Sequence, residues 1–252
     1  MELKRYFVEL AYNGSAYHGW QRQPNAISVQ QALEEALSKL ISETICLVGA
    51  GRTDTGVHAR QMFAHFDTEQ DISNPKELVF LLNGFLKDDI AIKTIRRVQP
   101  TAHARFDATA RDYEYHVAMS KDPFCAHLHY YLKNKPDIDL MNQAAKTLIL
   151  NKDFQCFSRS NTDVKTFLCD IKKAEWRQEG TSLVFYICAN RFLRNMVRAI
   201  VGTLLEIGFK KRKVEEMGKV IKSKERGKAG FSAPAHGLYL SRIEYPQNIF
   251  QD

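Results

Sequence analysis

The chain has 252 residues, of which 44% are hydrophobic, so it can bury a sizeable core in one large domain or two small ones. Its 36 Lys and Arg residues against 29 Asp and Glu residues give a net charge of +7, a moderate basic excess that suits a polyanionic partner without requiring one. The five cysteines are odd in number and widely spaced, and we find neither a signal peptide nor an apolar run long enough to span a bilayer, so we expect a cytoplasmic protein with free thiols and no membrane anchor.

The first hundred residues follow the order strand, helix, strand, strand, helix, strand. Alternating or β-branched runs predict strands at 4–11, 44–48, 61–66 and 89–98, and apolar stripes predict helices at 28–41 and 74–85. Ser28 and Gln31 form a capping box, and Asn74 before Pro75 is a typical helix start. This order is that of a ferredoxin-like half, with helices on one face of an antiparallel sheet.

The second part of the chain repeats the order without repeating the sequence. Strands are expected at 112–119, 164–176, 182–190 and 237–245, helices at 139–150 and 193–207, and an additional basic helix at 211–224. We therefore predict an α+β fold with two ferredoxin-like halves, residues 1–100 and 101–252. Their strands would form one long, mostly antiparallel sheet with helices on one face and a central cleft, where binding sites are favoured.

The segment GAGRTDTGVHAR, residues 49–60, connects two predicted strands and is longer than a turn requires. An Asp beside Gly is usually a turn residue, but Asp54 lies two residues after Arg52 on a projecting loop, which is a typical place for chemistry. The segment is not a P-loop, because it lacks the Gly-Lys-Ser/Thr ending and no helix follows. His58 and His65 have no partners at ligand spacing, so no metal site is predicted.

Five ordered motifs together extend over essentially the whole chain: YNGSAYHGWQRQ (12–23), GAGRTDTGVHA (49–59), AHARFDATARDYEYHV (102–117), NMVRAIVG (195–202) and SAPAHGLYL (232–240). These motifs resemble those of the bacterial tRNA pseudouridine synthase A family. The resemblance implies the pseudouridine synthase fold and an RNA-binding isomerase of tRNA processing, which converts uridine to pseudouridine at positions 38, 39 and 40 of the anticodon stem-loop. It also implies a homodimer that uses neither metal nor organic cofactor.

The functional residues of the family fall on matching positions of this chain. The resemblance places the catalytic aspartate at Asp54, the active-site tyrosine at Tyr113 and the arginine that pairs with the aspartate at Arg198. We further expect contacts with RNA or substrate from Gln21, Arg52, Thr53, His58, Arg105, Arg111, Arg191 and Arg194. In the helix at 193–207, Arg194, Arg198 and Gly202 are four residues apart on a face that could meet RNA or the cleft.

The residue types suit the reaction, which breaks the bond from C1′ to N1 and joins C1′ to C5. An ionised carboxylate can attack C1′ or remove the C2′ proton, and a paired guanidinium favours the ionised form. Tyr113 can stack on uracil and accept or relay the C5 proton through its hydroxyl. The target uridine must first leave the stem, and Arg52 could fill the vacated space or bind nearby phosphates.

Other interpretations of the sequence stay open. Tyr113 could be a core aromatic, and Arg191, Arg194 and the basic segment 210–228 could be solvated surface. A non-catalytic tRNA-binding protein of this fold would not need Asp54. The family usually has Asp where Asn13 stands and His where Lys152 stands, as well as Pro for Lys87 and Thr for Ser232. These departures leave room for a pseudouridine synthase that acts on a different RNA.

Overall fold

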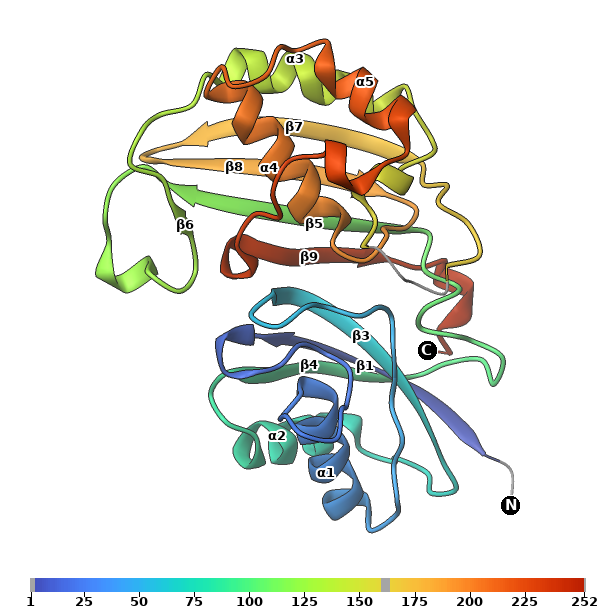
Figure 1. Ribbon diagram of the computed structural model, residues 1–252. Coiled ribbons are helices and arrows are strands. Elements are labelled where there is room, and N and C mark those ends of the chain that lie inside the picture. The colour runs from blue at the N-terminus through green and yellow to red at the C-terminus, as the bar shows by residue number, and fades with distance from the viewer. Residues whose placement is uncertain (1–2, 160–163, 252) are drawn as a thin grey trace. The chain divides into compact units, whose positions relative to one another are not determined.

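The structure, a computed structural model, describes residues 3–159 and 164–251 and contains two compact units (Figure 1). The first unit consists of Met1–Thr109 together with Leu240–Asp252, and the second is Ala110–Tyr239. This division differs from the expected 1–100 and 101–252, because the end of the chain returns to the first unit.

Packing of the C-terminal segment within the first unit explains this return. The Tyr245 ring lies edge-on to Phe7, at 5.3 Å between centroids, and to Phe63, at 5.1 Å. The Gln99 N–H donates to the Ile249 carbonyl at 2.9 Å. Aromatic pairs at these separations add stability beyond their buried area, so the C-terminal segment completes the core of the first unit.

The first unit has the expected order of strands and helices. Its elements are β1 (Lys4–Tyr12), α1 (Val29–Ile41), β2 (Val48–Gly49), β3 (His58–Thr68), α2 (Pro75–Phe85) and β4 (Ile90–Arg97). The strand order is β4-β1-β3, with β2 also beside β3, and these pairs are antiparallel. Helix α2 packs on β4 and on α1 (Figure 1). The β9 strand (Leu238–Glu244) begins in the second unit and runs into the first, where it lies beside β3.

Both predicted helix starts of the first unit are confirmed. The Ser28 hydroxyl accepts the Gln31 N–H at 3.2 Å, and the Asn74 side chain accepts the Glu77 N–H at 3.2 Å. The Gln31 side chain donates to Glu35 instead of returning to Ser28, so only half of the capping box forms. These side chains satisfy N–H groups that a helix leaves without an internal partner.

Strand β2 is much shorter than the expected strand at 44–48. The Ile45 N–H donates to the Ser38 hydroxyl at 2.9 Å, and the Leu47 N–H donates to the Glu34 carboxylate at 2.9 Å. Helix α1 therefore supplies the partners for this backbone, which a neighbouring strand would otherwise supply.

The second unit repeats the arrangement. Its elements are β5 (Ala110–Ala118), β6 (Tyr130–Tyr131), α3 (Ile138–Ile149), β7 (Ile171–Glu179), β8 (Ser182–Ala189), α4 (Met196–Gly208) and α5 (Glu216–Ser223). The strand order is β5-β8-β7, with antiparallel pairs, and the unpredicted β6 lies parallel to β5. Helix α3 packs on β7 and α4. The predicted α+β class with mostly antiparallel strands is confirmed.

Helix α4 begins at Met196 rather than at residue 193, because Asn195 has a left-handed backbone with φ of 67°. Arg194 therefore lies before the helix and does not share a helical face with Arg198. Gly202 is buried, and a Cβ built there would lie 1.8 Å from the Phe231 carbonyl oxygen. The prediction that Arg194, Arg198 and Gly202 share one exposed helical face was wrong. The lack of a side chain at this buried glycine permits close packing against the backbone of Phe231.

Candidate active site

The loop that carries Asp54 connects β2 to β3 in the first unit. At its start, the Ala50 N–H donates to the Phe63 carbonyl at 2.8 Å. At its end, the Val57 N–H donates to the Asp54 carbonyl at 3.1 Å, which closes a turn. The Asp54 side chain is half-buried, whereas the neighbouring Arg52 is exposed. The loop is thus held at both ends while its carboxylate can be reached.

The segment after β1 braces this loop at Thr53. The hydroxyl groups of Tyr12 and Thr53 share a hydrogen bond of 2.9 Å, and the Trp20 N–H donates to the Thr53 carbonyl at 3.4 Å. Gly19 has a φ of +84°, and a Cβ there would lie 2.2 Å from the same carbonyl oxygen. Only glycine combines this backbone conformation with so close an approach. Thr53, expected to contact substrate, uses its hydroxyl within the protein.

His58 lies at the other end of the loop and is only 1% exposed. Its Nδ1 atom accepts the Gly14 N–H at 3.0 Å, and a Cβ on Gly14 would lie 2.0 Å from the Val57 carbonyl oxygen. The His58 ring therefore supports the loop from within the protein, and its expected contact with RNA or substrate stays a prediction.

Asn13, one of the departures from the family pattern, accepts the Ser15 N–H at 3.0 Å and caps a short 3-10 turn. Asp and Asn are equally good at such a cap, so the departure preserves the local structure.

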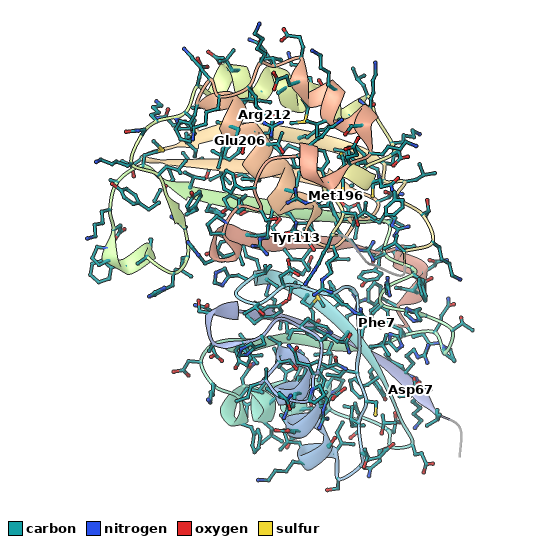
Figure 2. The ribbon with its side chains drawn as sticks, viewed as in Figure 1. Phe7, Asp67, Tyr113, Met196, Glu206 and Arg212 are labelled. Atoms are coloured by element: carbon teal, nitrogen blue, oxygen red, sulfur yellow. The ribbon has the colours of Figure 1, made fainter. Side chains whose placement is uncertain are left out.

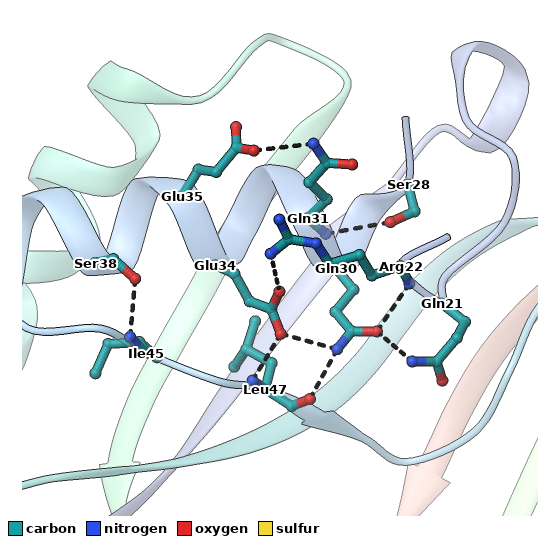
Figure 3. Close-up of polar contacts among 10 residues, drawn as sticks. All are labelled: Gln21, Arg22, Ser28, Gln30, Gln31, Glu34, Glu35, Ser38, Ile45 and Leu47. Atoms are coloured by element: carbon teal, nitrogen blue, oxygen red, sulfur yellow. Dashed lines mark hydrogen bonds and ion pairs between the residues drawn. The ribbon is translucent and has the colours of Figure 1, made fainter. Parts of the chain in front are cut away.

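Gln21, another expected contact, belongs to a polar network around the buried Glu34 (Figure 3). Its side-chain amide donates to Gln30 Oε1 at 2.8 Å, and the Gln30 amide donates in turn to Glu34 at 2.8 Å and to the Leu47 carbonyl at 3.0 Å. Arg22 pairs with the Glu34 carboxylate at 3.1 Å. Burial of a carboxylate is tolerated where it is paired and hydrogen-bonded in this way.

In the second unit, Tyr113 lies on β5 opposite Ile187 of β8 and is half-buried (Figure 2). Its ring meets the Phe192 ring edge-on at 5.1 Å between centroids. Arg111 is two residues earlier on the same strand, so both side chains lie on one face of the sheet. The Arg111 guanidinium donates to the Asn190 carbonyl at 2.9 Å.

Arg198 lies in the first turns of α4 and is held by the segment before β9. Its Nε atom donates to the Ala233 carbonyl at 2.7 Å, and its own carbonyl accepts the Ala233 N–H at 3.0 Å. Burial raises the pKa of Tyr115 well above its ordinary value, while the Arg198 charge acts in the opposite direction. Tyr115 stays protonated and donates to the Pro234 carbonyl at 2.8 Å. These bonds fix the backbone beside Arg198.

A second set of bonds fixes the start of α4. The Ser232 hydroxyl oxygen accepts the Asn195 amide at 2.8 Å and the Arg226 guanidinium at 2.9 Å. The threonine usual in the family at position 232 carries the same hydroxyl, so the serine keeps this junction.

The remaining expected contacts lie at the surface. Arg105 and Arg194 are exposed, and Arg191 is half-buried. The Arg194 carbonyl accepts the Arg159 N–H at 3.1 Å. Lys152, a further departure from the family pattern, lies 3.8 Å from Asp170 in an exposed ion pair, which contributes little to stability.

The chain matches the family model described as tRNA pseudouridine synthase over residues 10–107 and 144–246. The chain belongs to the tRNA pseudouridine synthase family. Asp54 and Arg198 lie within the two matched ranges, and Tyr113 lies in the stretch of chain between these ranges. The family expected from the five motifs is confirmed.

Curated relatives of this family align over nearly the whole chain. The tRNA pseudouridine synthase A of Bacteroides fragilis is 50% identical over 252 residues, which is 100% of both chains. That of Bacteroides thetaiotaomicron is 51% identical and covers 99% of this chain and 94% of the relative. That of Parabacteroides distasonis is 51% identical and covers 98% of each.

Sequence reasoning missed the residues that support the expected site, which are Tyr12, Gly14, Gly19, Asn195 and Arg226. The signal for the glycines was present in YNGSAYHGW, since two glycines within a few residues indicate close backbone packing. Within residues 3–159 and 164–251, no three His, Cys, Asp or Glu side chains gather as a metal ion would require. Among the helices of these ranges, none is long and apolar enough to cross a membrane.

Proposed function

We propose that this chain isomerises uridine to pseudouridine in tRNA, at positions 38, 39 and 40 of the anticodon stem-loop. The observation that carries the proposal is the set of full-length relatives at 50% and 51% identity that are named tRNA pseudouridine synthase A. The target positions follow from the resemblance of the five motifs. A cytoplasmic homodimer without metal or cofactor completes the proposal.

Asp54 is the reacting carboxylate in this proposal. It either attacks C1′ directly or removes the C2′ proton, and the bond from C1′ to N1 breaks in both routes. The uracil then turns, C5 joins C1′, the C5 proton leaves and N1 gains a proton. The braced Thr53 and Val57 support this role, because a fixed loop keeps the carboxylate in one reactive geometry.

Tyr113 and Arg198 assist the reaction. The half-buried Tyr113 ring on β5 can stack on the uracil, and its hydroxyl can accept or relay the C5 proton. The family resemblance assigns to Arg198 the role of the arginine that pairs with the catalytic aspartate. Arg52, exposed beside Asp54, occupies the space of the flipped uridine or binds its phosphates.

Replacement of Asp54 by Asn tests the proposal. An amide can neither attack C1′ nor remove a proton, so Asp54→Asn should abolish pseudouridine formation while tRNA affinity and thermal stability stay near normal. Chemical mapping of pseudouridine in a tRNA transcript with uridines at positions 38 to 40 provides the measurement. Asp88→Asn, which removes an exposed carboxylate of the same unit, is the control and should stay active.

The outcomes distinguish the proposal from its alternatives. Turnover of Asp54→Asn at even a hundredth of the normal rate would exclude Asp54 as the reacting group. A wild-type protein that binds tRNA without forming pseudouridine would be a binding protein. Product in another RNA but not in tRNA would identify a synthase with a different substrate.

A further inference from the structure

Phe106 lies between β4 and β5 in the first unit and is 72% exposed. Its neighbour Arg105 is also exposed, and the Arg105 guanidinium carbon lies 5.7 Å from the centre of the Phe106 ring. Single exposed aromatics are common, but this one lies beside a cation in a loop whose backbone is tightly bonded.

Hydrogen bonds hold the loop in one conformation. The His103 N–H donates to the Asp107 carboxylate at 2.7 Å, and the Asp107 N–H donates back to the His103 carbonyl at 3.1 Å. The Arg105 N–H donates to His103 Nδ1 at 3.1 Å. The Ala104 N–H donates to His65 Nδ1 at 3.1 Å, which ties the loop to β3.

The Phe106 ring is the outer member of a column of rings. It lies 4.3 Å from the His103 ring, and His103 lies 4.7 Å from the buried His65 ring. Burial, assisted by Arg5, lowers the pKa of both histidines, that of His65 to about 4. At neutral pH both Nδ1 atoms therefore remain acceptors, and the column keeps its geometry.

We propose that Phe106 is a stacking platform for one unpaired base of the RNA substrate and that Arg105 binds an adjacent phosphate. The proposal rests on the proposed function, since it assumes that RNA is the substrate. Bases stack on exposed aromatic rings of RNA-binding proteins, and Arg is the usual partner of the neighbouring phosphate. A ring that is already fixed loses little entropy when a base binds.

Binding of full-length tRNA by variants at position 106 tests the proposal. Phe106→Ala and Phe106→Leu should each raise the Kd about tenfold, because both remove the aromatic face, whereas Phe106→Tyr should leave the Kd unchanged. Phe80→Ala is the matched control, since Phe80 is 77% exposed on α2 of the same unit, and its Kd should be normal. A Leu variant that binds as well as the Tyr variant would overturn the proposal.

A tryptophan at this position reports stacking directly. Trp20 and Trp176 are 1% and 3% exposed, so Phe106→Trp introduces an indole whose surroundings differ from those of both. Addition of tRNA should quench its fluorescence, and a signal that does not change would overturn the proposal.

Two further results separate the inference from its alternatives. Dissociation of an oligomer by Phe106→Ala in sedimentation experiments would show that a second copy of the chain covers the ring, which also overturns the proposal. If the wild type forms pseudouridine and Phe106→Ala binds tRNA with normal affinity, the stacking role of Phe106 is refuted while the proposed function stands. Absence of product from the wild type would instead remove the proposed function.

Discussion

Thr53 directly precedes Asp54 in the sequence, and its hydroxyl forms a hydrogen bond within the protein. Tyr12, 41 residues earlier and only 4% exposed, shares a hydrogen bond of 2.9 Å with it. Since Thr53 precedes Asp54 directly, this bond limits the motion of the backbone that carries the carboxylate. We therefore expect Tyr12 to affect turnover through the position of Asp54 rather than through contact with substrate.

Removal of the Tyr12 hydroxyl should lower turnover without weakening RNA binding. We expect Tyr12→Phe to reduce kcat about tenfold with an unchanged KM for tRNA, because a looser loop misplaces Asp54. Tyr17→Phe is the matched control. Tyr17 is also 4% exposed, but its hydroxyl donates to Asp89 at 2.6 Å. Both variants should lose about 1 kcal/mol of stability, but only Tyr12→Phe should lose turnover. Equal kcat values for the two variants would refute the positioning role.

The sequence indicated which residues could react, but not how they are supported. Asp54, Tyr113 and Arg198 follow from motifs, and their roles remain predictions. Thr53, His58 and Gln21 were expected to contact RNA or substrate, which stays a prediction, and the sequence did not show that their side chains also form hydrogen bonds within the first unit. His58 and its partner Gly14 are 44 residues apart in the chain. Local spacing carries no information about such a pair, because the fold alone brings its members together.

At the scale of elements, the sequence located both helices of the first unit with their ends, but it did not give the start of α4 or the extent of β2. The start of α4 depends on the left-handed backbone of Asn195, whose amide bonds Ser232 37 residues away. The short β2 strand depends on Ser38 and Glu34 of α1, which bond the backbone that had been expected to form a longer strand. Tertiary contacts thus override local propensity at these boundaries.

Two glycines in helices of the second unit should respond in opposite ways to alanine. Gly202→Ala in α4 places a Cβ 1.8 Å from the Phe231 carbonyl oxygen, and the segment that holds Arg198 must move. We expect a loss of about 2 kcal/mol or more, with reduced turnover. Gly218→Ala in α5 meets only the Thr147 methyl group at 3.8 Å and should gain up to about 1 kcal/mol from helix propensity. Urea unfolding measures both changes, and equal shifts of the same sign would contradict this account of α4 packing.

For the whole molecule, the sequence predicted the α+β class and two similar orders of elements. It did not predict that the last segment of the chain would pack in the first unit. A strand pattern specifies which side chains are buried but not which strand lies alongside, and the aromatic contacts of Tyr245 with Phe7 and Phe63 cannot be read from residues so far apart. The first unit therefore depends on both ends of the chain.

His65 of β3 is buried in the first unit, and this burial should make the unit sensitive to acid. Burial, with smaller effects from Arg5 and His103, lowers the pKa of His65 from 6.5 to about 4, against the weaker opposite effect of Asp67 and Asp107. The unfolded chain therefore binds a proton as the pH falls below 6.5, whereas the native chain does not bind it until about pH 4. The free energy of unfolding should fall across this window, with a slope of up to about 1.4 kcal/mol per pH unit from one proton. The Arg5 guanidinium lowers the pKa of Asp67 below its ordinary value of 3.8. Protonation of Asp67 therefore reduces the free energy of unfolding only at a pH below this window.

Denaturant unfolding at several pH values tests this expectation. Trp20 reports on the first unit in a Trp176→Phe background, since each tryptophan is buried in a different unit. His65→Gln keeps an acceptor for the Ala104 N–H but cannot titrate, so stability between pH 6.5 and 4 should fall less steeply than in the parent. His18→Gln, at an exposed histidine of the same unit, is the control for the loss of an imidazole. The comparison uses slopes rather than absolute stabilities, because the glutamine also changes packing in the core. Identical slopes for the parent and His65→Gln would mean that His65 binds its proton equally in the folded and unfolded chains, and the acid sensitivity would then have to come from other groups.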